Sequence, residues 1–176
     1  MDSPTDGTVP TGGTVPIDGI VVAVDDPHAP DVAALLADHL GFAHDQSPPE
    51  HVHALPTDRL VDPAVTFVSA RDAARGRLLG VGALKQLSRT HGEVKSMHTR
   101  SSARGRGVAR AVLTHLLELA RERGYDRVSL ETGGTDAFVP ARTLYADVGF
   151  VRCPPFGDYT DNEFSVCMTL SLHGPQ

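Results

Sequence analysis

The sequence feature that most constrains the fold is the turn "RGRG" at residues 104–107, which stands between a strand pattern and a long helix pattern. The preceding segment "HGEVKSMHT" (91–99) alternates in polarity and predicts a strand. The segment 107–123 predicts a helix that ends at Gly124, because its apolar residues recur on one face: Val108, Val112, Leu116 and Leu119. The segment "DRVSLET" (126–132) predicts another strand. The chain is therefore expected to contain a strand–helix–strand unit whose helix begins at a glycine-rich turn.

The rest of the chain completes a mixed α/β pattern. Turn residues and periodicity predict strands at 19–24, 64–72, 77–87, 150–153 and 164–172, and helices from Asp31 to Gly41, at 47–55 and at 137–150. This order predicts a mixed sheet with helices on both faces. Residues 1–17 are rich in Gly, Thr and Pro and are expected to form a disordered tail, followed by one domain at 18–176.

Composition and charge exclude several classes of protein. The chain has 16 Lys and Arg against 22 Asp and Glu, a formal net charge of -6, which opposes nucleic-acid binding through "RTRSSARGRG". The sequence has no apolar run long enough for a membrane span and no secretory signal, so a cytoplasmic protein is expected. It lacks a Cys/His cluster, so no metal site is predicted, and Cys153 and Cys167 are expected to be reduced thiols.

The turn at 104–107 has the chemistry of an anion site. Backbone amides in the first turn of a helix have no partner within the helix, and the helix dipole places partial positive charge there. Glycine lets phosphate oxygens approach the backbone, and Arg104 and Arg106 can add charged contacts. The turn lacks the GK[ST] of a P-loop and the third glycine of a Rossmann turn. The pattern therefore predicts a different pyrophosphate cradle.

Two motifs resemble the GNAT superfamily of acyl-CoA-dependent N-acetyltransferases. "ARGRGVARAVLTHLLELARERGYDRVSLET" (103–132) resembles its motif A, and "PARTLYADVGF" (140–150) resembles its motif B, in the family's order. The resemblance spans about residues 65–172. It implies the GNAT fold, a central, mostly antiparallel sheet with one splayed parallel pair. It also implies direct transfer of the acetyl group of acetyl-CoA to a primary amine of a small molecule, and a homodimer is possible.

The same resemblance implies which residues contact acetyl-CoA. The pyrophosphate would be held by the amides of the turn: Arg104, Gly105, Arg106, Gly107, Val108 and Ala109. The strand residues Met97, His98 and Thr99 would pair with the pantetheine arm and polarise the acetyl carbonyl. Phe138 and Ala141 would line the pantetheine. Many relatives carry Asn where this chain has Phe138, so one polar contact with the cofactor is expected to be absent.

The resemblance also implies the catalytic residues. Tyr145 would be the general acid that protonates the departing thiolate, and Glu93 would be the general base, with Glu131 as the second candidate. Tyr145 and Glu93 each have a structural interpretation as well: Tyr145 as a core residue, and Glu93 as a surface strand residue paired with Lys95 on the same face.

No sequence motif identifies the residues that would bind the acceptor amine. The loop "FGDYTDNEF" (156–164) is either an ordinary connection or the rim of the acceptor pocket, where Asp158 and Asp161 would attract an amine and Tyr159 would stack on it. A non-catalytic acyl-CoA-binding or regulatory module on the same fold is the alternative function.

Overall fold

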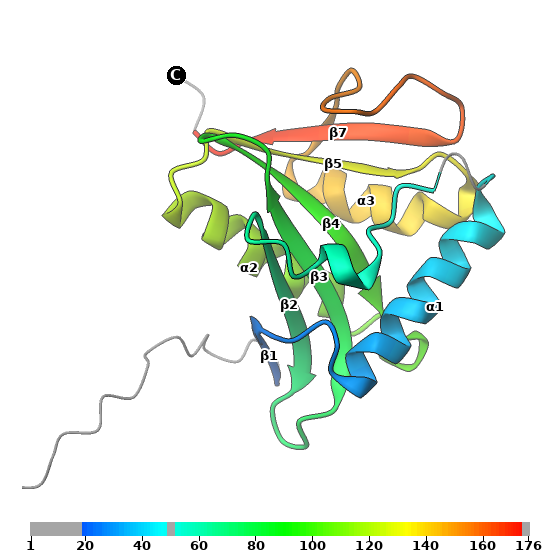
Figure 1. The fold of residues 1–176 in the computed structure, drawn as a ribbon, viewed down its shortest axis with the longest axis vertical. Helices are drawn as coiled ribbons and strands as arrows, with labels where there is room; N and C mark the ends of the chain where they lie inside the picture. Colours follow the sequence, from blue (N-terminus) through cyan, green and yellow to red (C-terminus); the bar gives the residue numbers. More distant parts are fainter. Residues whose placement is uncertain (1–18, 49–51, 174–176) are drawn as a thin grey trace, which may run out of the picture.

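The structure is a computed structural model and describes residues 19–48 and 52–173 (Figure 1). Its described part contains these strands: β1 (Ile20–Val24), β2 (Val65–Asp72), β3 (Leu78–Gln86), β4 (His91–Thr99), β5 (Arg127–Gly133), β6 (Val151–Arg152) and β7 (Ser165–Ser171). The α-helices are α1 (Pro30–Gln46), α2 (Val108–Glu122) and α3 (Val139–Val148). Short 3₁₀ turns precede β2, α2 and α3: η2 (Thr57–Arg59), η3 (Ser101–Ala103) and η4 (Asp136–Phe138).

The strands form one sheet in the order β1-β2-β3-β4-β5-β7-β6 (Figure 1). All neighbours in this sheet are antiparallel except β4 and β5. That parallel pair is short, because it joins only His91–Val94 to Arg127–Leu130. Beyond Val94 and Leu130 the two strands separate. The predicted mostly antiparallel sheet with a splayed parallel pair is confirmed.

Helices cover both faces of this sheet, as predicted. Figure 1 shows α1 on one face and α2 with α3 on the other. The α1 face has a small apolar core that includes Val32, Leu35, Leu36, Phe67 and Val81. The opposite face has a larger core, to which α2 contributes Val108, Val112, Leu113, Leu116 and Leu117.

Two glycines of β3 allow α2 to lie close to the sheet. A Cβ on Gly80 would lie 2.7 Å from Cγ1 of Val108, and a Cβ on Gly82 would lie 2.6 Å from Cγ1 of Val112. Since Gly80 is paired with Thr99 across β3 and β4, the first turn of α2 is brought beside the end of β4. The predicted phosphate-binding turn is thus placed next to the strand predicted to hold pantetheine.

Two predictions about helices were wrong. Helix α1 does not end at Gly41 but continues to Gln46. The turn after Gly41 is held by Phe42, whose ring packs against the rings of His98 and Phe138. These contacts outweigh the cost of a glycine in a helix, which is about 1 kcal/mol. The predicted helix at 47–55 is not formed by its described residues 47–48 and 52–55. Its residues 49–51, like the predicted tail at 1–17, lie outside the described residues.

Candidate active site

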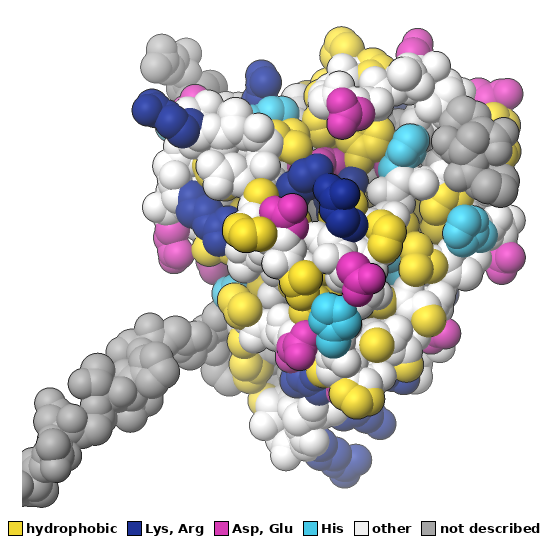
Figure 2. Space-filling model, viewed as in Figure 1, with side chains coloured by type: hydrophobic (Ala, Val, Ile, Leu, Met, Phe, Trp, Pro, Cys, Tyr) yellow, Lys and Arg dark blue, Asp and Glu magenta, His cyan; other side chains and the backbone are white. Residues whose placement is uncertain are grey.

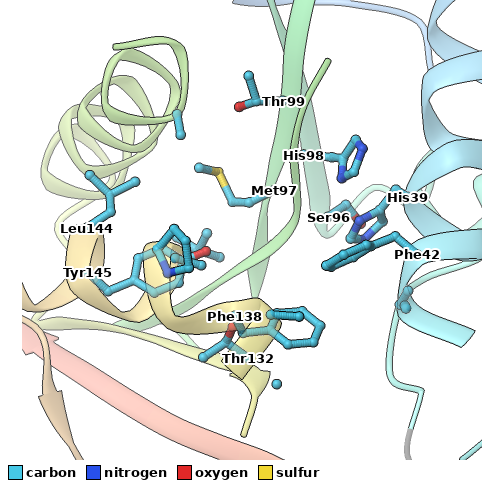
Figure 3. A pocket seen from close by; sticks show the side chains of 18 of the residues that line it. His39, Phe42, Ser96, Met97, His98, Thr99, Thr132, Phe138, Leu144 and Tyr145 are labelled. Atoms are coloured by element: carbon cyan, nitrogen blue, oxygen red, sulfur yellow. The ribbon is translucent and has the colours of Figure 1, made fainter. Parts of the chain in front are cut away.

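A cavity of about 610 Å³ opens where β4 and β5 separate (Figure 3). Its walls come from α1, β4, the first turn of α2, the end of β5 and the start of α3. It is lined by most of the predicted site residues: Met97, His98, Thr99, Arg104, Gly105, Gly107, Val108, Ala109, Phe138, Ala141 and Tyr145. The fold therefore gathers residues from both sequence motifs, such as Gly107 and Tyr145, around one space.

The turn before α2 has the backbone shape that its glycines suggest. Gly105 and Gly107 have φ values of +73° and +79°, and Gly107 is the N-cap residue of α2. Such positive φ values are readily adopted only by glycine. An added Cβ at either residue would meet no atom within 4 Å, so open space lies above the turn. The side chain of Arg106 lies outside the cavity lining, 3.9 Å from Asp72.

An irregularity in β4 distributes its side chains to the two sides of the cavity. Ser96 has a φ of +54°, and the register between β3 and β4 shifts between Val81 and Ala83. Beyond this point Met97 packs against the core of the α2 face, whereas the ring of His98 lies 5.2 Å from the ring of His39 on α1 (Figure 3). The cavity thus has an α2 side and an α1 side, divided by β4.

Tyr145 lies on the α2 side, with its neighbour Leu144 (Figure 3). Its side chain is buried in the larger core and contacts the ring of Phe150. Burial, assisted by the charge of Glu131, raises the pKa of the Tyr145 phenol, so the hydroxyl keeps its proton at neutral pH. The structural and the catalytic interpretations of Tyr145 are therefore compatible.

Glu131 lines the cavity directly after Leu130, the last residue of β5 that pairs with β4. Burial raises the pKa of its carboxyl group to about 7, against the opposing effect of Lys95, while the charge of Glu93 adds to the increase. A carboxyl group with this pKa is half ionised near neutral pH, which suits a group that accepts a proton in a reaction.

Glu93 lies outside the cavity lining. Its carboxylate accepts hydrogen bonds from Lys95 Nζ at 3.0 Å and from the Tyr159 hydroxyl. Lys95 Nζ also donates to the Tyr159 hydroxyl at 2.6 Å. The side chains of Glu93 and Lys95 are only 4% and 9% exposed. The predicted pairing of Glu93 with Lys95 is present, but the predicted surface position of Glu93 is wrong, because the pair lies in a buried network that ties the loop 156–164 to β4.

The same network positions the loop 156–164 relative to the cavity. Tyr159 points its hydroxyl into the network, and its ring meets His53, which lines the cavity. Asp158 and Asp161 are exposed and are not part of the cavity lining. The loop therefore contacts the cavity lining through Tyr159, and neither Asp158 nor Asp161 reaches the cavity wall.

Sequence reasoning missed several cavity residues, among them His39, Phe42, Lys95 and Ser96. His39 and Phe42 are three residues apart on α1, a spacing that places both rings on one helix face. That signal was hidden because the helix was expected to end at Gly41. The positive φ of Ser96 has no signal in the sequence, since serine rarely adopts this conformation.

The described residues contain no helix long and apolar enough to cross a membrane. They also contain no cluster of three or more His, Cys, Asp or Glu side chains placed to hold a metal ion. On the face shown in Figure 2, acidic and basic side chains are interspersed and do not form one continuous basic surface.

Comparisons with known proteins agree with this geometry. The model of the acetyltransferase (GNAT) family matches residues 30–150. The uncharacterized N-acetyltransferase YsnE of Bacillus subtilis is 46% identical over 86% of this chain and 99% of its own length. The uncharacterized N-acetyltransferase YedL of Escherichia coli is 42% identical over 86% of this chain and 94% of its own length. A GNAT family acetyltransferase from Elizabethkingia anophelis, solved with acetyl-CoA bound, shares the fold at a TM-score of 0.64 and 16% identity, covering 89% of this chain and 100% of that one.

Proposed function

Because this chain belongs to the GNAT family of acetyltransferases, we propose that it transfers the acetyl group of acetyl-CoA directly to the primary amine of a small molecule. The observation that supports this most is the single cavity that runs from the glycine turn before α2 to Glu131 and Tyr145. One space thus contains an anion cradle, a free strand edge, a carboxyl group and a phenol.

The donor side fits acetyl-CoA. The Arg104 amide donates to the Ser101 carbonyl at 3.3 Å, so the amides from Gly105 to Ala109 would bind the pyrophosphate, since the turn is open and no side chain covers the two glycines. The edge of β4 beyond Val94 has no strand partner on the β5 side among the described residues, so Met97, His98 and Thr99 would pair with the extended pantetheine. Ala141 and Phe138 would line its other side. Bound acetyl-CoA would supply an acyl group activated as a thioester.

The chain's own residues would then move two protons. Of the two candidate bases, Glu131 is the better placed, because it lines the cavity while Glu93 is engaged by Lys95 and Tyr159. Glu131 would accept the proton of the attacking amine, directly or through water. The β4 amides would polarise the carbonyl, and the Tyr145 hydroxyl would donate its proton to the departing sulfur. Both cysteines lie outside the cavity lining, so no covalent enzyme intermediate is proposed.

The test of the donor site compares two glycines of the same helix. Gly107→Glu and Gly124→Glu introduce the same strain and charge at opposite ends of α2, since φ is +79° and +71° and neither Cβ meets an atom within 4 Å. At a hundredfold excess over Kd, ligand binding stabilises a protein by about 2.7 kcal/mol, which shifts the melting temperature of a chain this size by roughly 5–10 °C. Acetyl-CoA should shift the Gly124→Glu variant and leave Gly107→Glu unchanged.

CoA release from acetyl-CoA with a panel of small amines then tests the transfer itself. Release that depends on the amine supports the proposed enzyme. Binding of acetyl-CoA without release on any amine would instead favour a non-catalytic acyl-CoA-binding or regulatory module. The cytoplasmic location and the homodimer stay predictions.

A further inference from the structure

The α1 side of the cavity is a continuous wall of rings (Figure 3). His39 and Phe42 come from α1, His98 from β4 and Phe138 from η4. Ring centroids are 5.2 Å apart for His39 and His98, 6.4 Å for Phe42 and His98, and 5.2 Å for Phe42 and Phe138. All of these pairs are tilted, a geometry in which aromatic edges meet faces. We refer to these four residues as the ring wall.

The ring wall shares His98 and Phe138 with the residues assigned to acetyl-CoA, whereas His39 and Phe42 are not among those residues. In Figure 3, Met97, Thr99, Leu144 and Tyr145 lie on the α2 and α3 side, whereas His39, Phe42 and His98 lie toward α1. Because an attacking amine and a bound thioester must approach from different directions, the side opposite the donor is where the acceptor would lie.

Cationic side chains outnumber carboxylates among the described residues that line this cavity, which include Lys95, Arg104 and Arg110. Burial lowers the pKa of His39 to about 4, with a contribution from His98. Burial and the charge of Arg104 lower the pKa of His98, against the effect of Asp38. Both imidazoles are therefore neutral at neutral pH. Among the described residues that line the cavity, Glu131 is the one carboxylate. An acceptor with several positive charges would lack partners for all but one of them.

We propose that the acceptor is a small monoamine that carries an aromatic ring, with its ring on the wall formed by Phe42, His98 and Phe138 and its amine at Glu131. The inference rests on the proposed function and narrows its substrate class. Neutral rings would pack against the aromatic group of the acceptor, and the single carboxylate would match its single ammonium group.

The test compares 2-phenylethylamine with 2-cyclohexylethylamine, which has a similar size without a π system, and with spermidine, which has several charges. CoA release gives kcat/KM for each amine, and calorimetric titration into the CoA-saturated protein gives each Kd. The wild-type protein should prefer the phenyl compound by about three- to tenfold over the cyclohexyl compound, the range expected for one aromatic contact. Spermidine should be the poorest acceptor.

Phe42→Leu should abolish this preference, and Phe156→Leu is the matched control. Phe156 also packs in a ring cluster, with His91 and Tyr159, but lies outside the cavity lining. Phe138→Leu repeats the test if Phe42→Leu does not fold.

Equal or better use of the cyclohexyl compound or spermidine would overturn the inference, as would a preference that survives both ring-wall variants. If no amine releases CoA, the proposed function fails. In that case the calorimetric Kd values alone test whether the ring wall binds an aromatic ring. Tighter binding of the phenyl compound supports this binding, and equal binding of the two compounds overturns the inference.

Discussion

The buried network of Glu93, Lys95 and Tyr159 makes a quantitative prediction about stability. Lys95→Met removes the cation and leaves the Glu93 carboxylate, whose side chain is 4% exposed, with the Tyr159 hydroxyl as its remaining partner. Removing one member of a buried ion pair costs about 3–5 kcal/mol, because the other charge stays out of water. The Tyr159 hydrogen bond should keep the cost near the lower limit, about 3 kcal/mol. That loss corresponds to a decrease of roughly 6–12 °C in melting temperature for a chain of this size.

A double-mutant cycle with Glu93→Gln distinguishes this mechanism from simple loss of packing. The double variant Glu93→Gln/Lys95→Met has no buried charge left unpaired, so it should be more stable than Lys95→Met alone. Urea unfolding followed by circular dichroism gives the free energies of unfolding. Arg110→Met is the control, since the ion pair of Arg110 with Asp147 is 53% and 57% exposed and should contribute less than about 1 kcal/mol. Additive losses in the cycle, or a Lys95→Met loss as small as that of the control, would refute the reasoning.

Further predictions concern the proton-transfer groups. Because the pKa of Glu131 is raised to about 7, kcat/KM should rise with pH through about 7, and Glu131→Gln should remove this limb. Because the pKa of Glu131 is raised in the folded protein, ionisation of this carboxyl group destabilises the fold as pH rises from about 4.5 through 7. The Glu131→Gln variant has no such group, so its free energy of unfolding should increase relative to that of the wild type over this range. An unchanged difference across this range would contradict the assigned burial. Tyr145→Phe should lower kcat by about 10²–10⁴-fold with little change in the Kd of acetyl-CoA, and unchanged turnover would exclude Tyr145 as the acid.

The parts of the fold set by local signals could be predicted from the sequence. The start of α2 follows from Gly107, because a positive φ at an N-cap is a property of one residue type. The buried faces of α2 and α3 follow from the spacing of their own apolar residues. The sheet with its splayed parallel pair was expected from the resemblance of the two motifs to the GNAT superfamily, and not from these local signals.

What depends on contacts between distant segments could not be predicted. Whether α1 passes Gly41 is decided by Phe42 meeting His98 and Phe138, which are more than fifty residues away. The choice between Glu93 and Glu131 has the same origin. Both are acidic residues on neighbouring strands, and only the position of Tyr159 on the C-terminal loop shows that Glu93 is engaged in a network outside the cavity.

The early end of the β4–β5 pairing has a consequence for solubility. Strand edges with free amide and carbonyl groups are sites where protein chains aggregate, because the strand of another molecule can add to them. Here the free edge of β4 beyond Val94 faces a cavity flanked by α1 and the first turn of α2, and does not lie at the rim of the sheet. The free edge of β4 is therefore kept away from the rim of the sheet, where the strand of another molecule could add most readily.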